Sequence, residues 1–580
     1  MNVSVMPVRS QDEVAVPAST LGCELITDFS RLEALSADWQ RLWRADPDGE
    51  IFQTFAWARA WWRCYAETVV LCSFAVFEGE RVIGIVPLVR DRDRIVFLGG
   101  RHADYCDLLC ESGRGAEVFE AALEALLRFP GWKECVLRNL KINSQVLVQS
   151  AKLPTRLRRY VQTVPGEDCC TILLGENCDV LGSLIGKGHT KRRLNKLRKA
   201  GALTFRHIET KAEAQAQLSA FFRHQVRRRA LAGKDRPAPE LCTFLRNLID
   251  ELDLTKELRF GVLELNGCPL AWHLSFYLNG KLLFYQQTFD VDAWDYSPGE
   301  VLIHELLDYA RENVTREVDF TRGNEPFKDR FTTHTRESYS LYIERSGMGG
   351  QLRRVLRGSM APWLRLGRHA QRVAKRRDLT FHRFRSFRLW ANGILARIRH
   401  HRQKGTLKIW ARNNVARLFG WLRLPRTHIA FIPPCRRNGY AMGGPVVSDS
   451  SLTARKGGLG DLVDIALQHP EILVPSELAK YRQRLKKGDQ VYLVWQGEEA
   501  VLMGWTTTRG PDEILRSSGG QKVSCCSPLM LMYECSPLSN AVEESFCRQL
   551  LCAVRKEAEK KELVLEVCCP DPLPADSLDE

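Results

Sequence analysis

The stretch that decides the fold runs from Lys281 to Phe331 and reads KLLFYQQTFDVDAWDYSPGEVLIHELLDYARENVTREVDFTRGNEPFKDRF. A strand-like run is followed by a helix with Ser297 at its N-cap and Pro298 at its first position, and then by a second strand-like run. The start of such a helix exposes unpaired N–H groups and a partial positive charge, which favour an anion. We therefore expect an anion site on the segment Ser297, Pro298, Gly299, Glu300 and Val301.

A turn of mixed charge follows this helix. Asp319 ends the second strand, and Arg322, Gly323 and Lys328 come directly after it. Arg322 and Lys328 are suited to hold a carboxylate or phosphate, Asp319 to orient Arg322, and Gly323 to supply a backbone geometry that other residues resist. The alternative interpretation is a surface cluster of ion pairs, which contributes little.

The whole chain alternates strand and helix patterns, so we predict a mixed α/β fold of twisted sheets flanked by helices. Asn266-Gly267 and Asn279-Gly280 indicate two hairpins between three successive strands. At 580 residues the chain exceeds one core. We expect a disordered leader at 1–21 and a first α/β domain at 22–345 with halves 22–165 and 166–345. A basic helical linker is expected at 346–428, a second α/β domain at 429–570 and an acidic tail at 571–580.

Composition indicates a cytoplasmic protein. The chain lacks a run of eighteen uncharged apolar residues and an apolar leader, so neither a membrane-spanning helix nor a signal peptide is expected. Its 19 cysteines are odd in number and include no C-x-x-C, so we interpret them as reduced thiols and expect no metal site.

The positive charge is concentrated in one segment. Residues 351–426 hold 21 Lys and Arg against one acid, Asp378, so this segment carries +20 while the whole chain carries +15. Trp390, Ile394 and Ile398 recur there at helical spacing beside the arginines. Three interpretations stay open: binding to an anionic membrane surface or a membrane-embedded synthase, helices packed on the rest of the protein, or contact with nucleic acid.

The segment GCPLAWHLSFYLNGKLLFYQQTFDVDAWDYSPGEVLIHELLDYARENVTREVDFTRGNEPFKDRF resembles the BioF2-like acetyltransferases. These are the CelD/BcsL relatives within the Gcn5-related N-acetyltransferase (GNAT) superfamily, close to the FemAB peptidyltransferases. The matching elements are Gly267, Ala271, Tyr296 to Gly299, Leu302, Asp319-Phe320, Gly323 and Phe327-Lys328. With IFQTFAWARAWW, VIGIVPLV, DYCDLL and KRRLNKLRKAG, the resemblance covers about 30–345.

The resemblance implies a central sheet splayed at one point and acetyl-CoA, or another acyl-CoA, as the donor. Its pyrophosphate would rest on Ser297–Val301. Proton transfer needs a base for the acceptor and an acid for the leaving thiolate. The catalytic candidates are Asp319, Tyr285, His273 and Asp107, and the substrate-binding candidates are Asp104, Tyr105, Arg322, Gly323, Lys328 and Trp57. Asp104 and Asp107 as turn formers, and His273 as a sheet histidine, are the alternatives.

The last third also resembles a GNAT core, but a shorter and degenerate one. SPLSNAVEES stands where active members carry a glycine-rich loop, so this domain is expected to act as a scaffold or in acceptor recognition. The resemblance implies an N- or O-acyltransferase, acting by direct transfer on a sugar, polysaccharide precursor or lipid-linked acceptor, and located in the cytoplasm or at the inner membrane face. The alternatives are a FemAB-like transferase that uses aminoacyl-tRNA, and an inactive assembly factor for exopolysaccharide or cellulose synthesis.

Overall fold

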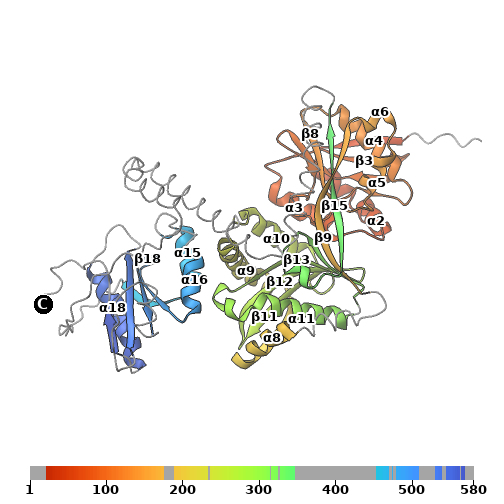
Figure 1. Cartoon of the computed structure of the whole chain (residues 1–580). Coiled ribbons are helices and arrows are strands. Elements are labelled where there is room, and N and C mark those ends of the chain that lie inside the picture. The colour runs from red at the N-terminus through yellow and green to blue at the C-terminus, as the bar shows by residue number, and fades with distance from the viewer. Residues whose placement is uncertain are drawn as a thin grey trace, which may run out of the picture. The chain divides into compact units, whose positions relative to one another are not determined.

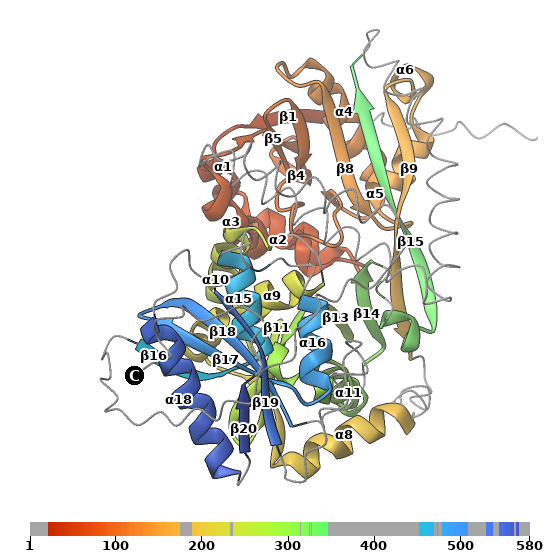
Figure 2. The ribbon, with the colours of Figure 1, turned by 60° about the vertical axis from the view of Figure 1, so that its left-hand side comes forward.

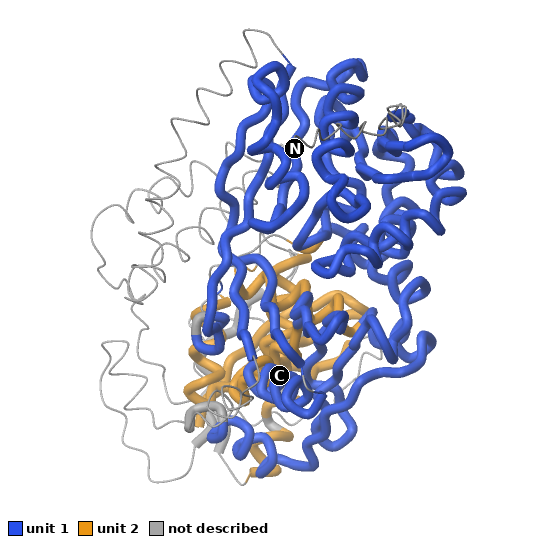
Figure 3. Tube along the Cα trace, turned by 90° about the vertical axis from the view of Figure 1, so that its right-hand side faces the viewer, with its two compact units in different colours: residues 1–219, 238–287, 300–373 blue, residues 220–237, 288–299, 374–580 orange. Residues whose placement is uncertain are grey.

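The computed structural model describes residues 21–174, 188–232, 236–345 (apart from 314, 324 and 326), 452–468, 473, 478–508, 529–537, 544–561 and 564–567. The chain divides into two compact units (Figure 3). Unit 1 comprises 1–219, 238–287 and 300–373, and unit 2 comprises 220–237, 288–299 and 374–580. The predicted leader, the basic linker and the acidic tail lie outside the described residues, as does most of SPLSNAVEES.

Unit 1 is built on one long mixed sheet of eleven strands with the order β10-β11-β12-β13-β14-β9-β15-β8-β6-β5-β2. The strands are β2 (Val70–Leu71), β5 (Leu88–Asp91), β6 (Arg94–Phe97), β8 (Glu134–Leu140), β9 (Val161–Leu173), β10 (Leu203–Ile208), β11 (Leu258–Leu265), β12 (Cys268–Leu278), β13 (Lys281–Phe289), β14 (Glu317–Arg322) and β15 (His334–Glu344). A second sheet, β1-β3-β4-β7, contains β1 (Leu21–Ile26), β3 (Ser73–Glu78), β4 (Arg81–Val86) and β7 (Leu109–Cys110).

The long antiparallel strands β9 and β15 run side by side across unit 1 and join its N-terminal part to the strands around β13 and β14 (Figure 1). The predicted boundary between the halves, at 165/166, therefore falls inside β9. The two Asn-Gly hairpins are confirmed, because Asn266, Gly267, Asn279 and Gly280 all have positive φ, as the predicted tight turns require.

The helices of unit 1 cover its sheets. They are α1 (Phe29–Ala34), α2 (Ser36–Ala45), α3 (Phe55–Tyr65), α4 (Gly115–Arg128), α5 (Gln145–Lys152), α6 (Thr155–Arg158), α8 (Gly188–Ala200), α10 (Pro239–Glu251) and α11 (Pro298–Glu312), with 3-10 turns η1 (Ile51–Gln53) and η3 (Lys328–Arg330). Helix α9 (Lys211–Leu231) begins in unit 1 and continues into unit 2, and the 3-10 turn η2 (Val291–Tyr296) belongs to unit 2. Helices α8 and α11 lie on one side of β11 to β13, with α9 and α10 on the other (Figures 1 and 2). Because side chains alternate along a strand, Trp272 of β12 bonds Gln217 of α9 while the neighbouring His273 points to the other face.

Unit 2 contains a five-stranded sheet with the order β16-β17-β18-β19-β20. Its strands are β16 (Leu452–Gly457), β17 (Gln490–Gln496), β18 (Glu499–Thr507), β19 (Leu529–Pro537) and β20 (Val564–Val567), and its helices are α15 (Leu459–Gln468), α16 (Leu478–Lys486) and α18 (Glu544–Lys560). One buried cluster packs α15 and α16 on the sheet through Leu462, Tyr481 and Trp505. A second packs α18 through Leu550 and Val554. Antiparallel strands followed by a parallel β19–β20 pair make the predicted α/β arrangement of this region.

Candidate active site

A β-bulge in β14 creates the site. Strands β13 and β14 pair in parallel only at Lys281–Leu283 with Glu317–Asp319. Beyond this point the register of β14 against β9 shifts between Asp319 and Arg322. Thr321 lies in the left-handed region with a φ of 57°, which is strained for a β-branched residue. Its N–H donates to Asp319 Oδ1 at 2.7 Å and its Oγ1 donates to the Phe284 carbonyl at 3.2 Å. The bulge therefore ends the parallel pairing and fixes the Asp319 carboxylate.

Asp319 is paired with a tyrosine from the N-terminal part of unit 1. The Tyr105 hydroxyl lies 3.0 Å from both Asp319 carboxylate oxygens, and both side chains are buried. Burial, with the nearby charges of Glu50 and Glu317, raises the pKa of Asp319 to about 6, although Lys281 and the Thr321 N–H act in the opposite direction. Burial also raises the pKa of Tyr105 well above its ordinary value, so Tyr105 stays protonated. Asp319 therefore has the near-neutral pKa that a general base needs.

Two lysines and a glutamate lie beside this pair. Lys141 Nζ and Lys281 Nζ both donate to Glu50 Oε1, at 2.8 and 2.6 Å. Glu50 is 1 % exposed, and the net effect of the two ammonium groups is to lower its pKa although burial raises it. Among the described residues, Glu50 Oε2 has no hydrogen-bond partner. Buried charges of this kind are stable only when they are paired.

These side chains line a cavity of about 890 Å³ within unit 1. Its wall contains four cationic side chains, Lys141, Lys281, Arg316 and Arg336, and four acidic ones, Asp48, Glu50, Glu317 and Glu337. Tyr105, Cys169, Pro47, Gly49, Ile142, Asn143, Leu173, Leu278, Asn279 and Gly280 complete it. Burial raises the pKa of Cys169 to about 12, so this thiol stays protonated and is a poor nucleophile. Tyr105 thus connects the cavity with Asp319.

The mixed-charge turn is organised differently from the prediction. Asp104, and not Asp319, contacts Arg322, with Arg322 Nε donating to Asp104 Oδ1 at 3.2 Å. Lys328 Nζ donates to the Arg322 carbonyl at 2.7 Å and pairs with Glu325 at 3.0 Å, so this buried lysine closes the turn. Gly323 has a φ of 104°, as the prediction of an unusual backbone geometry requires. Because the turn is short, the Lys328 side chain folds back onto the backbone of Arg322.

The other candidates lie away from the cavity wall. Asp107 accepts N–H bonds from Leu108 and from Gln145 and Val146 at the start of α5, and burial raises its pKa to about 7 although the backbone donors lower it. The Tyr285 hydroxyl donates to the His102 carbonyl at 3.0 Å. Neither residue contacts the Asp319 carboxylate in the hydrogen bonds of the described residues.

His273 and Trp57 are both core residues. His273 is fully buried, its ring centroid lies 4.0 Å from that of Phe284, and its ring nitrogens have no hydrogen-bond partner within the described residues. Burial keeps its pKa well below the ordinary value and the ring neutral. Trp57 is fully buried between Phe52 and Phe244, with Nε1 donating to the Gly99 carbonyl. The contacts that the structure shows for Trp57 are therefore packing contacts within the core, and its role in substrate binding stays a prediction.

The predicted donor segment is a helix start, as expected, but with a different cap. Helix α11 begins at Pro298, while Ser297 lies in the left-handed region with a φ of 54° rather than in the extended conformation usual for an N-cap. Glu300 in the first turn pairs with Arg193 and Arg330, and the contact with Arg330 measures 2.5 Å. These guanidinium groups neutralise the carboxylate that would otherwise repel an anion at this helix start.

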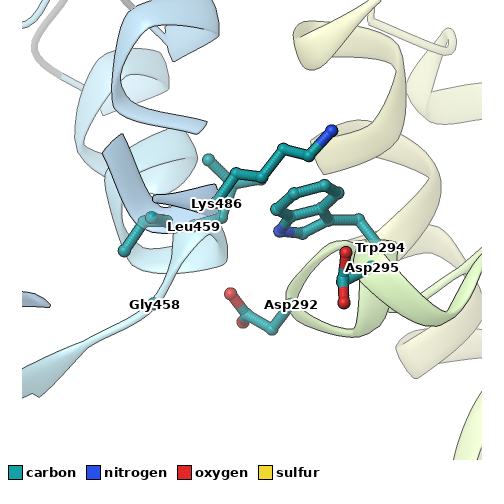
Figure 4. Close-up of a pocket in the computed structure, with 7 residues that line it drawn as sticks. Asp292, Trp294, Asp295, Gly458, Leu459 and Lys486 are labelled. Atoms are coloured by element: carbon teal, nitrogen blue, oxygen red, sulfur yellow. The ribbon is translucent and has the colours of Figure 1, made fainter. Parts of the chain in front are cut away.

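A second cavity, of about 380 Å³, lies in unit 2 (Figure 4). Three residues of η2 and four residues from later in the chain line this cavity. They are Asp292, Trp294, Asp295, Gly458, Leu459, Leu485 and Lys486. Asp292 Oδ1 accepts the Gly460 N–H at 2.9 Å, at the start of α15, and Arg482 lies 4.5 Å from the Trp294 ring. An internal carboxylate therefore already binds the N–H group that this helix start offers.

Glu50, Lys141 and Lys281 were not among the site residues predicted from the sequence. Glu50 follows the turn Pro47-Asp48-Gly49 and carries no local sign of burial, and Lys141 directly follows β8. Lys281 offered a usable signal, because it opens a strand whose next three residues are buried hydrophobics. A lysine at the start of a buried strand in the deciding segment could have been singled out.

A family model matches one part of the chain. Residues 187–329 match the family model described as the acetyltransferase (GNAT) domain, and this range contains the β13–α11–β14 crossing and Asp319. Together with the mixed α/β sheets, the match supports an acyltransferase of the GNAT type. No curated protein matches the chain.

Several solved structures are similar to this chain at low sequence identity. The crystal structure of FemX is 12 % identical, covers 58 % of this chain and 100 % of its own, and has a TM-score of 0.41. The C-terminal domain of a putative lysylphosphatidylglycerol synthetase from Agrobacterium fabrum is 12 % identical, with coverages of 57 % and 96 % and a TM-score of 0.35. A tandem GNAT protein from the clavulanic acid biosynthesis pathway is 12 % identical, with coverages of 57 % and 99 % and a TM-score of 0.33.

None of the helices described combines the length and apolar character of a membrane-spanning helix. In the same part of the chain, no group of three or more His, Cys, Asp and Glu side chains is placed to hold a metal ion. The cysteines that the structure describes are free thiols.

Proposed function

We propose that unit 1 is an acyl-CoA-dependent N- or O-acyltransferase that uses Asp319 as its general base. The observation that carries the proposal is the buried Asp319–Tyr105 hydrogen bond at the bulge that ends the β13–β14 pairing, next to a cavity of about 890 Å³. Asp319 has a pKa of about 6 because it is buried, so it is ionised at neutral pH and still a useful proton acceptor. It lies within the residues that match the acetyltransferase domain.

The proposed reaction is a direct transfer. The acceptor amine or hydroxyl attacks the thioester carbonyl while its proton moves to the Asp319 carboxylate. The tetrahedral intermediate then collapses, the carbon–sulfur bond breaks, and the protonated carboxyl returns the proton to the departing thiolate. The Tyr105 hydroxyl is a positioning group in this scheme, because its hydrogen bond holds the carboxylate in place.

The donor is proposed to bind at the first turn of α11, with its pyrophosphate against Ser297–Val301. Two observations support this site: the helix begins at Pro298, and Arg193 and Arg330 neutralise Glu300. Free N–H groups at a helix start favour phosphate oxygens. The acceptor is proposed to be a sugar, polysaccharide precursor or lipid-linked intermediate, as the resemblance to the BioF2-like family implies.

The experiment is calorimetric titration of the full chain with acetyl-CoA and with charged tRNA. The proposal expects binding of acetyl-CoA, together with consumption of acetyl-CoA when amine or hydroxyl acceptors are present. Binding of charged tRNA and not of acetyl-CoA contradicts it. The absence of binding and turnover with either donor would instead favour an assembly role for the chain.

The tRNA-dependent alternative has one observation in its favour. Helix α8 exposes Lys191, Arg192, Lys196, Arg198 and Lys199, while Leu194 and Leu197 are buried. An exposed basic face attracts phosphate backbones. Its test is salt dependence, since tRNA binding through this face would weaken steeply with salt and with Lys196→Gln plus Lys199→Gln.

Peripheral association with an anionic membrane, or with a membrane-embedded synthase, is proposed for residues 351–426 on their charge of +20. Flotation with anionic liposomes tests this part of the proposal. Deletion of 351–426 is expected to abolish flotation, whereas unchanged flotation of the deletion variant contradicts it.

A further inference from the structure

We infer that the Lys141–Lys281 pair in the cavity of unit 1 seats an anionic oxygen group, a phosphate or a carboxylate, of the acceptor. The inference rests on the proposed function and adds the chemical class of its substrate: an amine or hydroxyl that carries an anionic group a few bonds away. It comes from the cavity wall itself, where both lysines and Glu50 lie.

The two ammonium groups have donors to spare. Each ammonium carries three N–H groups. Within the described residues, Lys281 Nζ donates to Glu50 Oε1 alone, and Lys141 Nζ donates to Glu50 Oε1 and the Asp48 carbonyl. Three N–H groups therefore remain for a ligand. Both side chains are only 20 % exposed, so water reaches them mainly through the cavity.

The charge at this point also favours an anion. One carboxylate oxygen binds two ammonium groups, so the Glu50 cluster carries a net positive charge. Glu50 and Asp319 keep the pKa of Lys281 above its ordinary value although burial lowers it. Lys281 thus stays charged inside the cavity. Burial of a charge is costly unless an opposite charge is present. Glu50 supplies one negative charge for the two ammonium groups, and an acceptor oxyanion supplies a second.

The acids of the cavity wall are less available to a cationic ligand. Glu317 is bound by Arg336 and by the Thr171 hydroxyl, and Asp48 by Asn143. Glu337 accepts from the Tyr339 hydroxyl, and Glu50 Oε2 is buried away from solvent. At the Glu50 cluster, the hydrogen-bonding groups that face the cavity and are left for a ligand are therefore N–H groups of Lys141 and Lys281.

The proposed anion site on Lys141 and Lys281 lies near Asp319, the proposed general base. Glu50 and Lys281 are close enough to Asp319 to influence its pKa, and Tyr105 contacts both the cavity and Asp319. An acceptor anchored on the lysines would present a nucleophile a few bonds from its anion to the Asp319 carboxylate. Binding of the acceptor's anionic group to the lysines would thereby orient its nucleophile for the reaction.

The test uses three amines that differ in the anionic group: ethanolamine, O-phosphoethanolamine and β-alanine. Calorimetry on the full chain is expected to give at least about tenfold tighter binding of an anionic amine than of ethanolamine. The phosphate and carboxylate arms decide which anion is preferred. Lys141→Met and Lys281→Met are expected to remove this preference, whereas Lys152→Met, an exposed lysine of α5, is expected to retain it.

Because Lys281→Met leaves Glu50 with one partner, the double variant Glu50→Gln with Lys281→Met removes the charges together and provides a second test. Equal affinity for the three amines in the wild-type chain, or a preference that survives both Lys141→Met and the double variant, overturns the inference. Calorimetry requires no turnover. A retained anion preference without acetyl-CoA consumption therefore contradicts the proposed function and supports the anion site on Lys141 and Lys281. Turnover of ethanolamine without any anion preference supports the proposed function and contradicts the anion site.

Discussion

The Tyr105 hydroxyl lies 3.0 Å from both carboxylate oxygens of Asp319, although 214 residues separate the two in sequence. This hydrogen bond joins the N-terminal part of unit 1 to β14, and both partners are buried. A carboxyl buried in this way favours its protonated form more than a carboxyl in water does. The predictions below follow from this environment.

The Asp319→Asn variant is expected to be more stable than the wild-type protein at alkaline pH. The pKa of Asp319 is raised from an ordinary 3.8 to about 6, so the ionised group destabilises the folded state, and the stability difference grows as pH rises from 4 to 6. The shift corresponds to about 3 kcal/mol of unfolding free energy at pH 8, and to none below pH 3.5. Urea unfolding at pH 3.5 and pH 8 measures it.

Asp253→Asn is the control with the opposite sign. The hydrogen bonds from the Thr255 hydroxyl and N–H lower the pKa of Asp253 to about 2. Its substitution is therefore expected to destabilise the protein at pH 7, with the effect fading below pH 3.8 as the acid protonates. A gain in stability for Asp319→Asn that is equal at both pH values contradicts the first expectation.

Lys281→Met is expected to move the acidic limb of the activity profile to higher pH. Lys281 lowers the pKa of Asp319, so its loss raises that pKa and protonates the base at a higher pH. A shift of about one unit is expected for a nearby charge. Turnover with ethanolamine, which lacks an anionic group, separates this effect from acceptor anchoring. Lys281→Arg is expected to keep the limb in place, and an unmoved limb in Lys281→Met argues against the coupling.

Lys328→Met is expected to lower stability by about 1–3 kcal/mol, because it removes a buried donor from the Arg322 carbonyl and the ion pair with Glu325. Thermal unfolding measures the loss. Affinity for the anionic amines is expected to stay within about twofold of wild type, since Lys328 lies outside the cavity wall. A stable variant with weakened acceptor binding would instead support the prediction that Lys328 binds substrate.

Trp57→Ala is expected to cost about 3–5 kcal/mol in unfolding free energy because the side chain is fully buried among aromatic rings. Trp57→Phe is expected to cost less, since it keeps most of the ring packing. Acetyl-CoA affinity of the folded fraction should not change. A Trp57→Phe variant with normal stability and a raised KM for the acceptor contradicts this structural role.

The sequence was sufficient for the elements whose signals are local. Asn-Gly pairs require positive φ, which made the hairpins at Asn266 and Asn279 predictable. Pro298 at a helix start was a local signal of the same kind. Asp319 could also be singled out from the sequence, although β14 continues beyond it to Arg322, because an acid among buried strand residues is unusual.

The partners of these residues depend on long-range packing and were not predictable in the same way. Asp104 contacts Arg322 because the sheet brings chain segments 218 residues apart together. Glu50 meets Lys281 across 231 residues. Asp107 accepts N–H bonds at the start of α5 because that helix begins beside it, which the sequence does not specify. The BioF2-like assignment, the donor segment and the acceptor class stay predictions.

The most direct test of the central claim is acetyl-CoA consumption by the wild-type and Asp319→Asn proteins between pH 5 and pH 9, at saturating amine. The wild-type rate should rise through an acidic limb near pH 6, because Asp319 has a pKa of about 6. At pH 8, Asp319→Asn should lose about 100- to 10,000-fold in kcat while its acetyl-CoA affinity stays unchanged. A variant that turns over within about twofold of the wild-type rate, with the same acidic limb, contradicts the assignment of Asp319 as the base.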